Sequence, residues 1–172
     1  MSDRQTCRSG SARGRAMQHV MAIMVSTAVL ISASGSGTLA GPKDDAFAVI
    51  QNWATAFNAS DIDKIIAAYT PEASVHGTTA NSLAVGKDAL RAYFGPAARS
   101  RNQVKLAQDG SEATTMLGDG QVVVAGFYEF SGTRPDGQAF TAPARYTFVL
   151  VKQDGAWLIA HQHSSPRARP AQ

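Results

Sequence analysis

Cysteine is nearly absent from this sequence, because Cys7 is the only one among its 172 residues. A single thiol cannot form a disulfide within the chain, and thiolate zinc sites and paired redox sites need more sulfur than this. Cys7 also lies in a segment that we expect to be removed, so a cysteine nucleophile is excluded for the remainder. The fold must therefore rest on a hydrophobic core, for which a domain of about 130 residues is large enough.

Beyond residue 40 the chain has no excess of positive over negative residues. The net charge is +3, but four of the 16 Lys and Arg and one of the 13 Asp and Glu precede residue 41, so 12 of each sign remain beyond it. A nucleic-acid-binding domain needs a clustered positive excess. We therefore expect no nucleic-acid partner.

The chain also lacks an apolar run long enough to span a membrane, which takes about 20 residues. One apolar segment, residues 20–32 (VMAIMVSTAVLIS), follows four arginines and precedes small residues that end at Ala40. This order is typical of a secretory signal peptide. We predict that residues 1–40 are removed, that the protein is periplasmic or secreted, and that it meets the membrane only transiently, through this peptide.

Helical periodicity marks three segments of the expected mature chain. One begins at Asp44 or Asp45, a second is capped by Asp61 and ends at Pro71, and a third covers residues 87–98. Their apolar faces comprise Phe47, Ile50, Trp53 and Phe57, then Ile62, Ile65, Ile66 and Tyr69, then Leu90, Tyr93, Phe94 and Ala97. A short strand over residues 73–76 and a polar loop separate the second helix from the third.

Alternating residues and Gly-containing turns follow, and they predict strands near residues 103–108, 112–117, 121–131, 139–153 and 156–164. The last three are long and consecutive, which favours an antiparallel arrangement. Helices grouped before strands indicate an α+β fold, with three helices packed on one face of a curved antiparallel sheet. We expect one domain over residues 41–165, a disordered tail over residues 166–172, and a ligand cavity between helices and sheet.

Four segments carry a family pattern in a fixed order. They are Trp53-x3-Phe57 with Asp61-x-Asp63 and Ala68-Tyr69; Gly86-x4-Arg91-x-Tyr93-Phe94; residues 145–149 (RYTFV); and Asp154-Gly155-x-Trp157-x-Ile159-x3-His163-Ser164-Ser165. The chain thereby resembles the nuclear-transport-factor-2-like superfamily, in particular the SnoaL-like proteins, the SgcJ/EcaC family and the association domain of calcium/calmodulin-dependent protein kinase II. The resemblance implies a cone-shaped fold and a homodimer formed through the outer sheet face. It leaves the activity open, because this fold hosts isomerases, cyclases and association modules.

The last predicted strand contains the candidate catalytic histidines. Strand alternation places His161 and His163 on the face that carries Trp157. The pair can transfer protons or hydrogen-bond a neighbour, and Glu129 can serve His163 as an acid–base partner. A metal site would add an acidic ligand to these histidines and His76. Because no Asp or Glu lies at a spacing from them that is typical of metal ligands, we expect no metal ion. The sequence has no glycine-rich dinucleotide fingerprint, so we expect no cofactor.

Arg145 is the candidate ligand-binding residue. It lies between apolar strand neighbours, where a guanidinium is costly to bury without an acceptor. By resemblance to the kinase association domain, the matching arginine faces the cavity, where it can bind a carboxylate or another anion; a salt bridge to Glu129 is the alternative. Trp53, Tyr69 and Tyr93 belong either to the core or to the cavity wall, where the two hydroxyls would act as donors.

We therefore predict an exported, cofactor-free protein that binds a small molecule, with or without acid–base catalysis. The alternative is a noncatalytic homo-oligomerisation module. An open polar cavity that reaches Arg145 and the histidines favours ligand binding, whereas a cavity plugged by Trp53, Tyr93 and Phe94 favours the association module.

Overall fold

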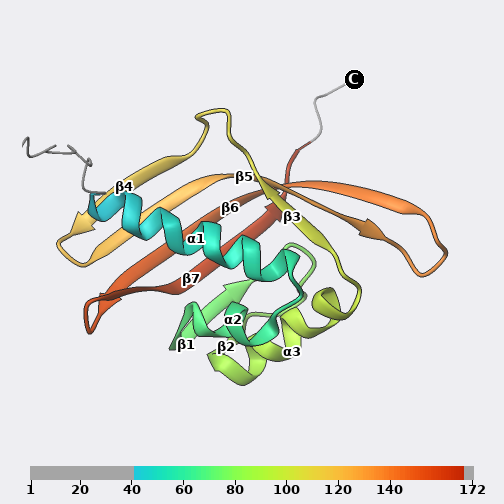
Figure 1. Cartoon of the computed structure of the whole chain (residues 1–172), viewed down its shortest axis with the longest axis horizontal. Coiled ribbons are helices and arrows are strands. Elements are labelled where there is room, and N and C mark those ends of the chain that lie inside the picture. The colour runs from blue at the N-terminus through green and yellow to red at the C-terminus, as the bar shows by residue number, and fades with distance from the viewer. Residues whose placement is uncertain (1–40, 169–172) are drawn as a thin grey trace, which may run out of the picture. The chain divides into compact units, whose positions relative to one another are not determined.

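Residues 41–168 form the part of the chain that the computed structural model describes (Figure 1). The predicted signal peptide with its cleavage site, and residues 169–172 of the predicted tail, lie outside this range. Within it, no helix is long and apolar enough to cross a membrane.

Three helices form where the periodicity predicts them: α1 (Pro42–Asn58), α2 (Ile62–Ala67) and α3 (Gly86–Arg99). α1 begins slightly earlier than predicted, because Gly41 is its N-cap and donates its backbone N–H to the Asp44 carboxylate over 3.0 Å. Asp61 caps α2 as predicted, since its carboxylate accepts a hydrogen bond of 3.1 Å from the backbone N–H of Lys64. Such caps satisfy backbone donors that have no partner within the helix.

Seven strands form one sheet. They are β1 (Tyr69–His76), β2 (Ala84–Val85), β3 (Gln103–Leu106), β4 (Ala113–Gly118), β5 (Gln121–Thr133), β6 (Ala139–Gln153) and β7 (Ala156–Pro166). Their order is β2-β1-β7-β6-β5-β3, and β4 also pairs with β5. β1 and β7 run parallel while the other neighbours are antiparallel, so the sheet is mixed rather than wholly antiparallel.

β1 begins at Tyr69, a residue that helical periodicity assigned to the second helix. The reason lies in β7, which is remote in the sequence. The backbone N–H of Ile159 donates to the carbonyl of Ala68 over 2.8 Å, and Tyr69 pairs with Ile159, so the chain joins the sheet directly after α2. Pro71 therefore lies within a strand instead of ending a helix.

The helices cover one face of the curved sheet, here called the inner face, while no element among residues 41–168 covers the outer face (Figure 1). Side chains alternate along the long strands, so every second residue is buried over 122–128 of β5 and over 144–150 of β6. The largest fully buried side chains are Trp53, Tyr69, Phe148, Ile50, Ile65, Leu90, Leu150 and Ile159. The predicted α+β fold, with three helices on a curved sheet, is confirmed.

Candidate functional site

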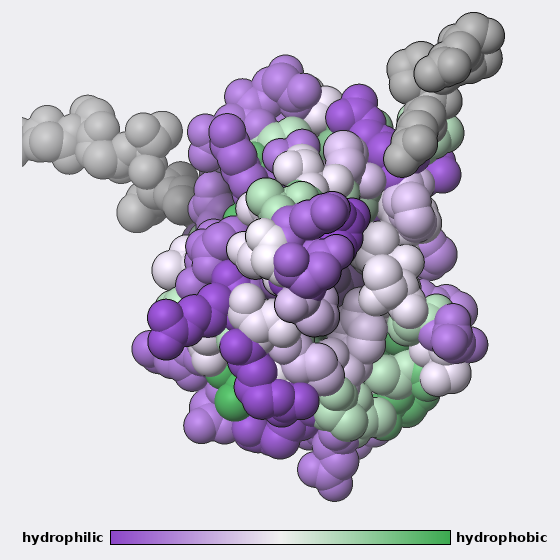
Figure 2. Space-filling view, turned by 90° about the vertical axis from the view of Figure 1, so that its right-hand side faces the viewer, coloured by the Kyte–Doolittle hydropathy of each residue, from purple (hydrophilic) through white to green (hydrophobic). Residues whose placement is uncertain are grey.

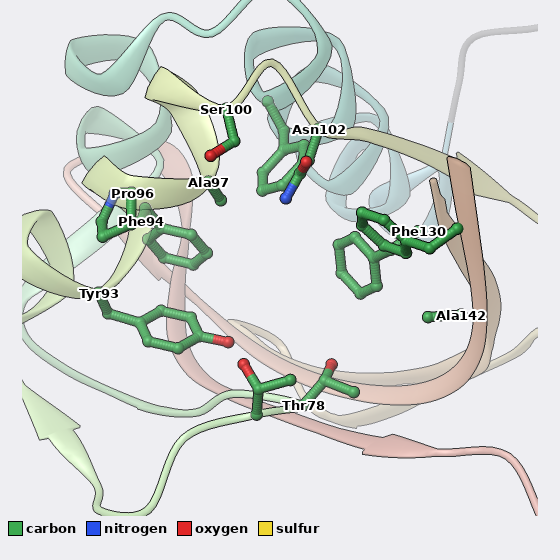
Figure 3. A pocket seen from close by; sticks show the side chains of 12 residues that line it. Thr78, Tyr93, Phe94, Pro96, Ala97, Ser100, Asn102, Phe130 and Ala142 are labelled. Atoms are coloured by element: carbon green, nitrogen blue, oxygen red, sulfur yellow. The ribbon is translucent and has the colours of Figure 1, made fainter. Parts of the chain in front are cut away.

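A cavity of about 320 Å³ lies between α3, the loop after β1 and the β5–β6 hairpin (Figure 3). Its wall is mostly apolar, and none of the lining side chains carries a charge. The lining residues are Phe57, Thr78, Thr79, Tyr93, Phe94, Pro96, Ala97, Ser100, Asn102, Phe130, Phe140 and Ala142. Cavities of roughly 300–1,000 Å³ with a few polar groups are typical small-molecule sites, and this one is at the small end of that range.

The hairpin beside this cavity forms one end of the described domain. Seen from that end, most of the surface is hydrophilic and the hydrophobic residues form smaller patches (Figure 2).

Polar groups reach the cavity from different sides. Tyr93 extends from α3 toward the threonines of the loop after β1, while Asn102 lies across the cavity from it (Figure 3). Burial raises the pKa of Tyr93, so its hydroxyl stays protonated and can donate. The Asn102 Oδ1 atom is buried and has no hydrogen-bond partner among the described residues. Gly77 makes room for Tyr93, because a Cβ at this position would overlap the phenol ring and hydroxyl.

A cluster of polar side chains, called the network below, lies between the cavity and the sheet and comprises Thr78, Ser164, Gln162, Tyr69 and Tyr128. The Thr78 hydroxyl hydrogen-bonds to the Ser164 hydroxyl, and the Tyr69 hydroxyl donates to Gln162 Oε1. The Tyr128 hydroxyl lies close to Ser164 and Gln162 without meeting the geometry of a hydrogen bond. Burial raises the pKa of Tyr128 to about 12 and that of Tyr69 well above 10. Both phenols therefore remain neutral donors at physiological pH.

A β-bulge in β7 decides which side chains reach this network. Relative to β6, the strand carries one extra residue, Ala160, so the residues after it face the opposite side from that predicted by simple alternation. Gln162 and Ser164 are buried on the inner face, whereas His161 and His163 lie on the outer face. The prediction that both histidines share a face with the buried residues before the bulge is wrong.

The outward histidines have other neighbours. His161 Nδ1 is hydrogen-bonded to the Ser74 hydroxyl at 2.8 Å. The pKa of His161 is lowered mainly by burial and further by the nearby charges of His163 and His76. His163 is exposed and lies beside His76. Neither candidate catalytic histidine lines the cavity.

Arg145 and Glu129 also lie on the outer face. Arg145 is exposed, and its Nε–H donates to the Ser165 hydroxyl over 3.0 Å. The expectation of a buried guanidinium facing the cavity is wrong, because strand alternation turns the neighbouring Ala144 and Tyr146 inward instead. Glu129 is exposed, and no ion pair among residues 41–168 joins it to Arg145. The two residues therefore form neither the predicted salt bridge nor a part of the cavity wall.

Trp53 fills the deep end of the space between helices and sheet. It is only 1% exposed, and its ring packs against those of Phe57, Phe94, Tyr128 and Phe148 at centroid distances between 5.5 and 6.4 Å. Its indole Nε1–H is buried without a hydrogen-bond partner. Aromatic side chains thus plug the deep end, which favours the association module, but Tyr93 and Phe94 line an open cavity, which favours ligand binding.

Sequence reasoning missed most of the polar residues at the site. Simple alternation puts Gln162 and Ser164 on the face opposite Trp157, and only the bulge reverses this. Tyr128 lies in a strand that the sequence predicted, but no sequence signal indicated which residues it would meet. Asn102 follows Arg101, whose φ of 53° marks a tight turn after α3, and no sequence signal pointed to it.

The fold and the sequence can be compared with those of known proteins. The sequence profile of the SnoaL-like domain family matches residues 47–169. Among curated proteins, none matches the chain. A solved structure from Xanthomonas campestris, named for a calcium/calmodulin-dependent protein kinase II association domain, is 27% identical with a TM-score of 0.68, over 76% of this chain and 91% of that one.

Two further structures share the fold at lower identity. A ketosteroid isomerase-like protein from Erwinia carotovora atroseptica is 23% identical, with a TM-score of 0.63, over 74% of this chain and 97% of that one. The association domain of C. elegans CaMKII is 20% identical, with a TM-score of 0.60, over 72% and 94% of the two chains. The profile match over most of the described domain shows that this chain belongs to the SnoaL-like domain family, and its three helices on one face of a curved sheet form the fold seen in an NTF2-like protein from Salmonella enterica.

Proposed function

We propose that this chain is exported and that its domain binds a small neutral molecule in the cavity beside α3. The cavity wall supports this proposal, because it combines aromatic and aliphatic side chains with hydroxyl and amide groups and carries no charge. An ion buried there without a counter-charge would be disfavoured by several kcal/mol. We therefore propose a neutral ligand here, in place of the carboxylate that Arg145 suggested from the sequence. A volume of about 320 Å³ suits a compact molecule with one or two rings.

Two polar groups can orient such a ligand. The Tyr93 hydroxyl can donate to a carbonyl or hydroxyl oxygen, and the Asn102 amide nitrogen, which points toward the middle of the cavity (Figure 3), can donate to a second oxygen of the ligand. Aromatic neighbours supply the contact area, as in most small-molecule sites. The proposed function is binding and requires no proton transfer from His161, His163 or Glu129, which lie on the other face of the sheet.

The test compares two probes of similar shape that differ in charge. 4-Hydroxyacetophenone is a neutral ketone, and 4-hydroxybenzoate replaces its acetyl group with a carboxylate. At mildly acidic pH we expect calorimetry to give at least about tenfold tighter binding of the ketone, because the wall offers no counter-charge. Equal or tighter binding of the carboxylate would contradict the proposal.

A pair of variants on α3 locates the binding. Ala97 lines the cavity, while Ala92 lies on the exposed side of the same helix. We expect Ala97→Phe to fill the cavity and abolish ketone binding, and Ala92→Phe to leave it unchanged. Unchanged binding in the Ala97→Phe protein would place the ligand elsewhere.

A second proposed function is self-association through the outer face, as a homodimer. Half-buried apolar side chains gather there on the central strands: Val123, Ala125, Phe127, Val149, Val151 and Leu158. Contiguous apolar surface of this kind marks interaction sites in soluble proteins. The likeness to the Xanthomonas campestris structure, named for an association domain, supports the same proposal. The two functions are compatible, because they use opposite faces of the sheet.

A further inference from the structure

Two histidines meet on the outer face, where β1 and β7 run parallel. His76 of β1 and His163 of β7 are direct partners in the strand register. Both side chains are exposed, and their ring centroids lie 5.9 Å apart with the planes at 87°. The two residues are far apart in the sequence, and only the parallel pairing of the strands brings them together.

This separation fits two imidazoles bound to one metal ion. A zinc ion lies about 2.0–2.1 Å from an imidazole nitrogen, and the nitrogen lies about 1.1 Å from its ring centre. Two rings sharing an ion therefore have centroids about 5.2 Å apart at a tetrahedral angle and about 6.4 Å apart in a linear arrangement. The observed 5.9 Å lies within this interval. The spacing of the two rings is therefore compatible with both of them binding one ion.

His161 occupies the neighbouring outward position of β7, but it has a different partner. Its Nδ1 is hydrogen-bonded to the Ser74 hydroxyl, which pairs with it across the same two strands. Within residues 41–168, no three His, Cys, Asp or Glu side chains gather closely enough to hold one ion together. A site here would therefore use two protein ligands and leave its other positions to water.

We propose that His76 and His163 form a two-imidazole site for a divalent transition-metal ion such as Zn²⁺ or Ni²⁺. Imidazole is a preferred ligand of these ions, which tolerate partly hydrated coordination. Two rings held side by side bind an ion more tightly than either alone, because the second contact is intramolecular. The site is independent of the cavity, which lies on the inner face.

The test is calorimetric titration of ZnCl₂ into the full chain, without an affinity tag and with Cys7 replaced by serine in every protein compared. We expect one ion to bind at this site, and we expect His76→Gln or His163→Gln to weaken its binding about a hundredfold, since each removes the paired contact. Both residues are exposed, so the variants are expected to keep the parent's circular dichroism spectrum. His19 is common to all the proteins and does not affect the comparison.

His161→Gln is the matched control. It removes an outward histidine from the same strand but not a proposed ligand, and its zinc affinity is expected to stay within about threefold of the parent value. Zinc affinity that is the same in the parent and in the His76→Gln protein would overturn the proposal. A loss in the His161→Gln protein as large as that in the His163→Gln protein would overturn the assignment of the ligand pair.

Discussion

Tyr69 and Gln162 are 93 positions apart in the sequence, and their side chains share a buried hydrogen bond. Both residues are almost fully buried, at 0% and 2% exposed, so neither group can exchange its partner for bulk water. A buried polar atom that loses its partner costs more free energy than the hydrogen bond contributes when both partners are present. The two residues therefore stabilise the fold as a pair.

This pairing predicts an asymmetric response to substitution. We expect Tyr69→Phe to lower the free energy of unfolding by about 1–3 kcal/mol, because Gln162 Oε1 is left without a donor. The double variant Tyr69→Phe/Gln162→Met removes both polar partners, so its loss is expected to be smaller than the sum of the two single losses by at least about 1 kcal/mol. Urea denaturation of the four proteins measures this coupling, and additive losses would show that the pair is not coupled.

At the scale of elements, one side chain joins α1 to the sheet. Asn58, the last residue of α1, donates through Nδ2 to the Val104 carbonyl over 2.9 Å and accepts from the Val104 N–H over 2.7 Å. Its amide thus pairs with β3 as a neighbouring strand would, and satisfies backbone groups on the edge of the sheet. The link fixes the end of α1 next to the cavity, since Phe57 is one of the lining residues.

Removing this amide is expected to loosen the helix from the sheet edge. Asn58→Ala should lower the free energy of unfolding by about 1–2 kcal/mol, because two hydrogen bonds are lost. Asn52→Ala, at an exposed position on the same helix, should change it by no more than about 0.5 kcal/mol. Thermal and urea denaturation measure both values. Equal effects of the two substitutions would show that helix propensity, rather than the Asn58 amide, accounts for the loss.

At the scale of the whole molecule, the two faces of the sheet have different proposed functions: ligand binding on the inner face, and self-association and metal binding on the outer face. The inner face is closed by helices around a small neutral cavity, and the outer face carries half-buried apolar side chains and the His76–His163 pair. Self-association would cover part of the outer face and leave the cavity accessible. Ligand binding and assembly can therefore be tested independently.

Val149 lies near the centre of the outer face and opposite Val123 in the ladder, which makes it a sensitive position for assembly. We expect native mass spectrometry to find a homodimer of the parent protein and a monomer of the Val149→Lys protein, because a charge cannot be buried without a partner in an apolar interface. Thr133→Lys, at an exposed position at the end of β5, is the control and should remain dimeric. A monomeric parent would contradict self-association, and the same spectra report any retained ligand.

The amino-acid sequence determined the α+β class, the three helices and most strand positions, because these depend on the local spacing of apolar residues and on turn residues. Asp61 as a helix cap and the strand at residues 139–153 could be predicted for this reason. The family resemblance also followed from the order of short motifs, since it requires no knowledge of which strands pair.

Only the tertiary structure decided which residues meet. The extra residue Ala160 turns Gln162 inward and His163 outward, and a bulge has no signature in apolar alternation. The parallel pairing of β1 with β7 places His76 beside His163, and that register depends on contacts between remote segments. The site therefore differs from the sequence-based prediction although the α+β class does not, because a shift of one residue preserves the strand but exchanges its faces.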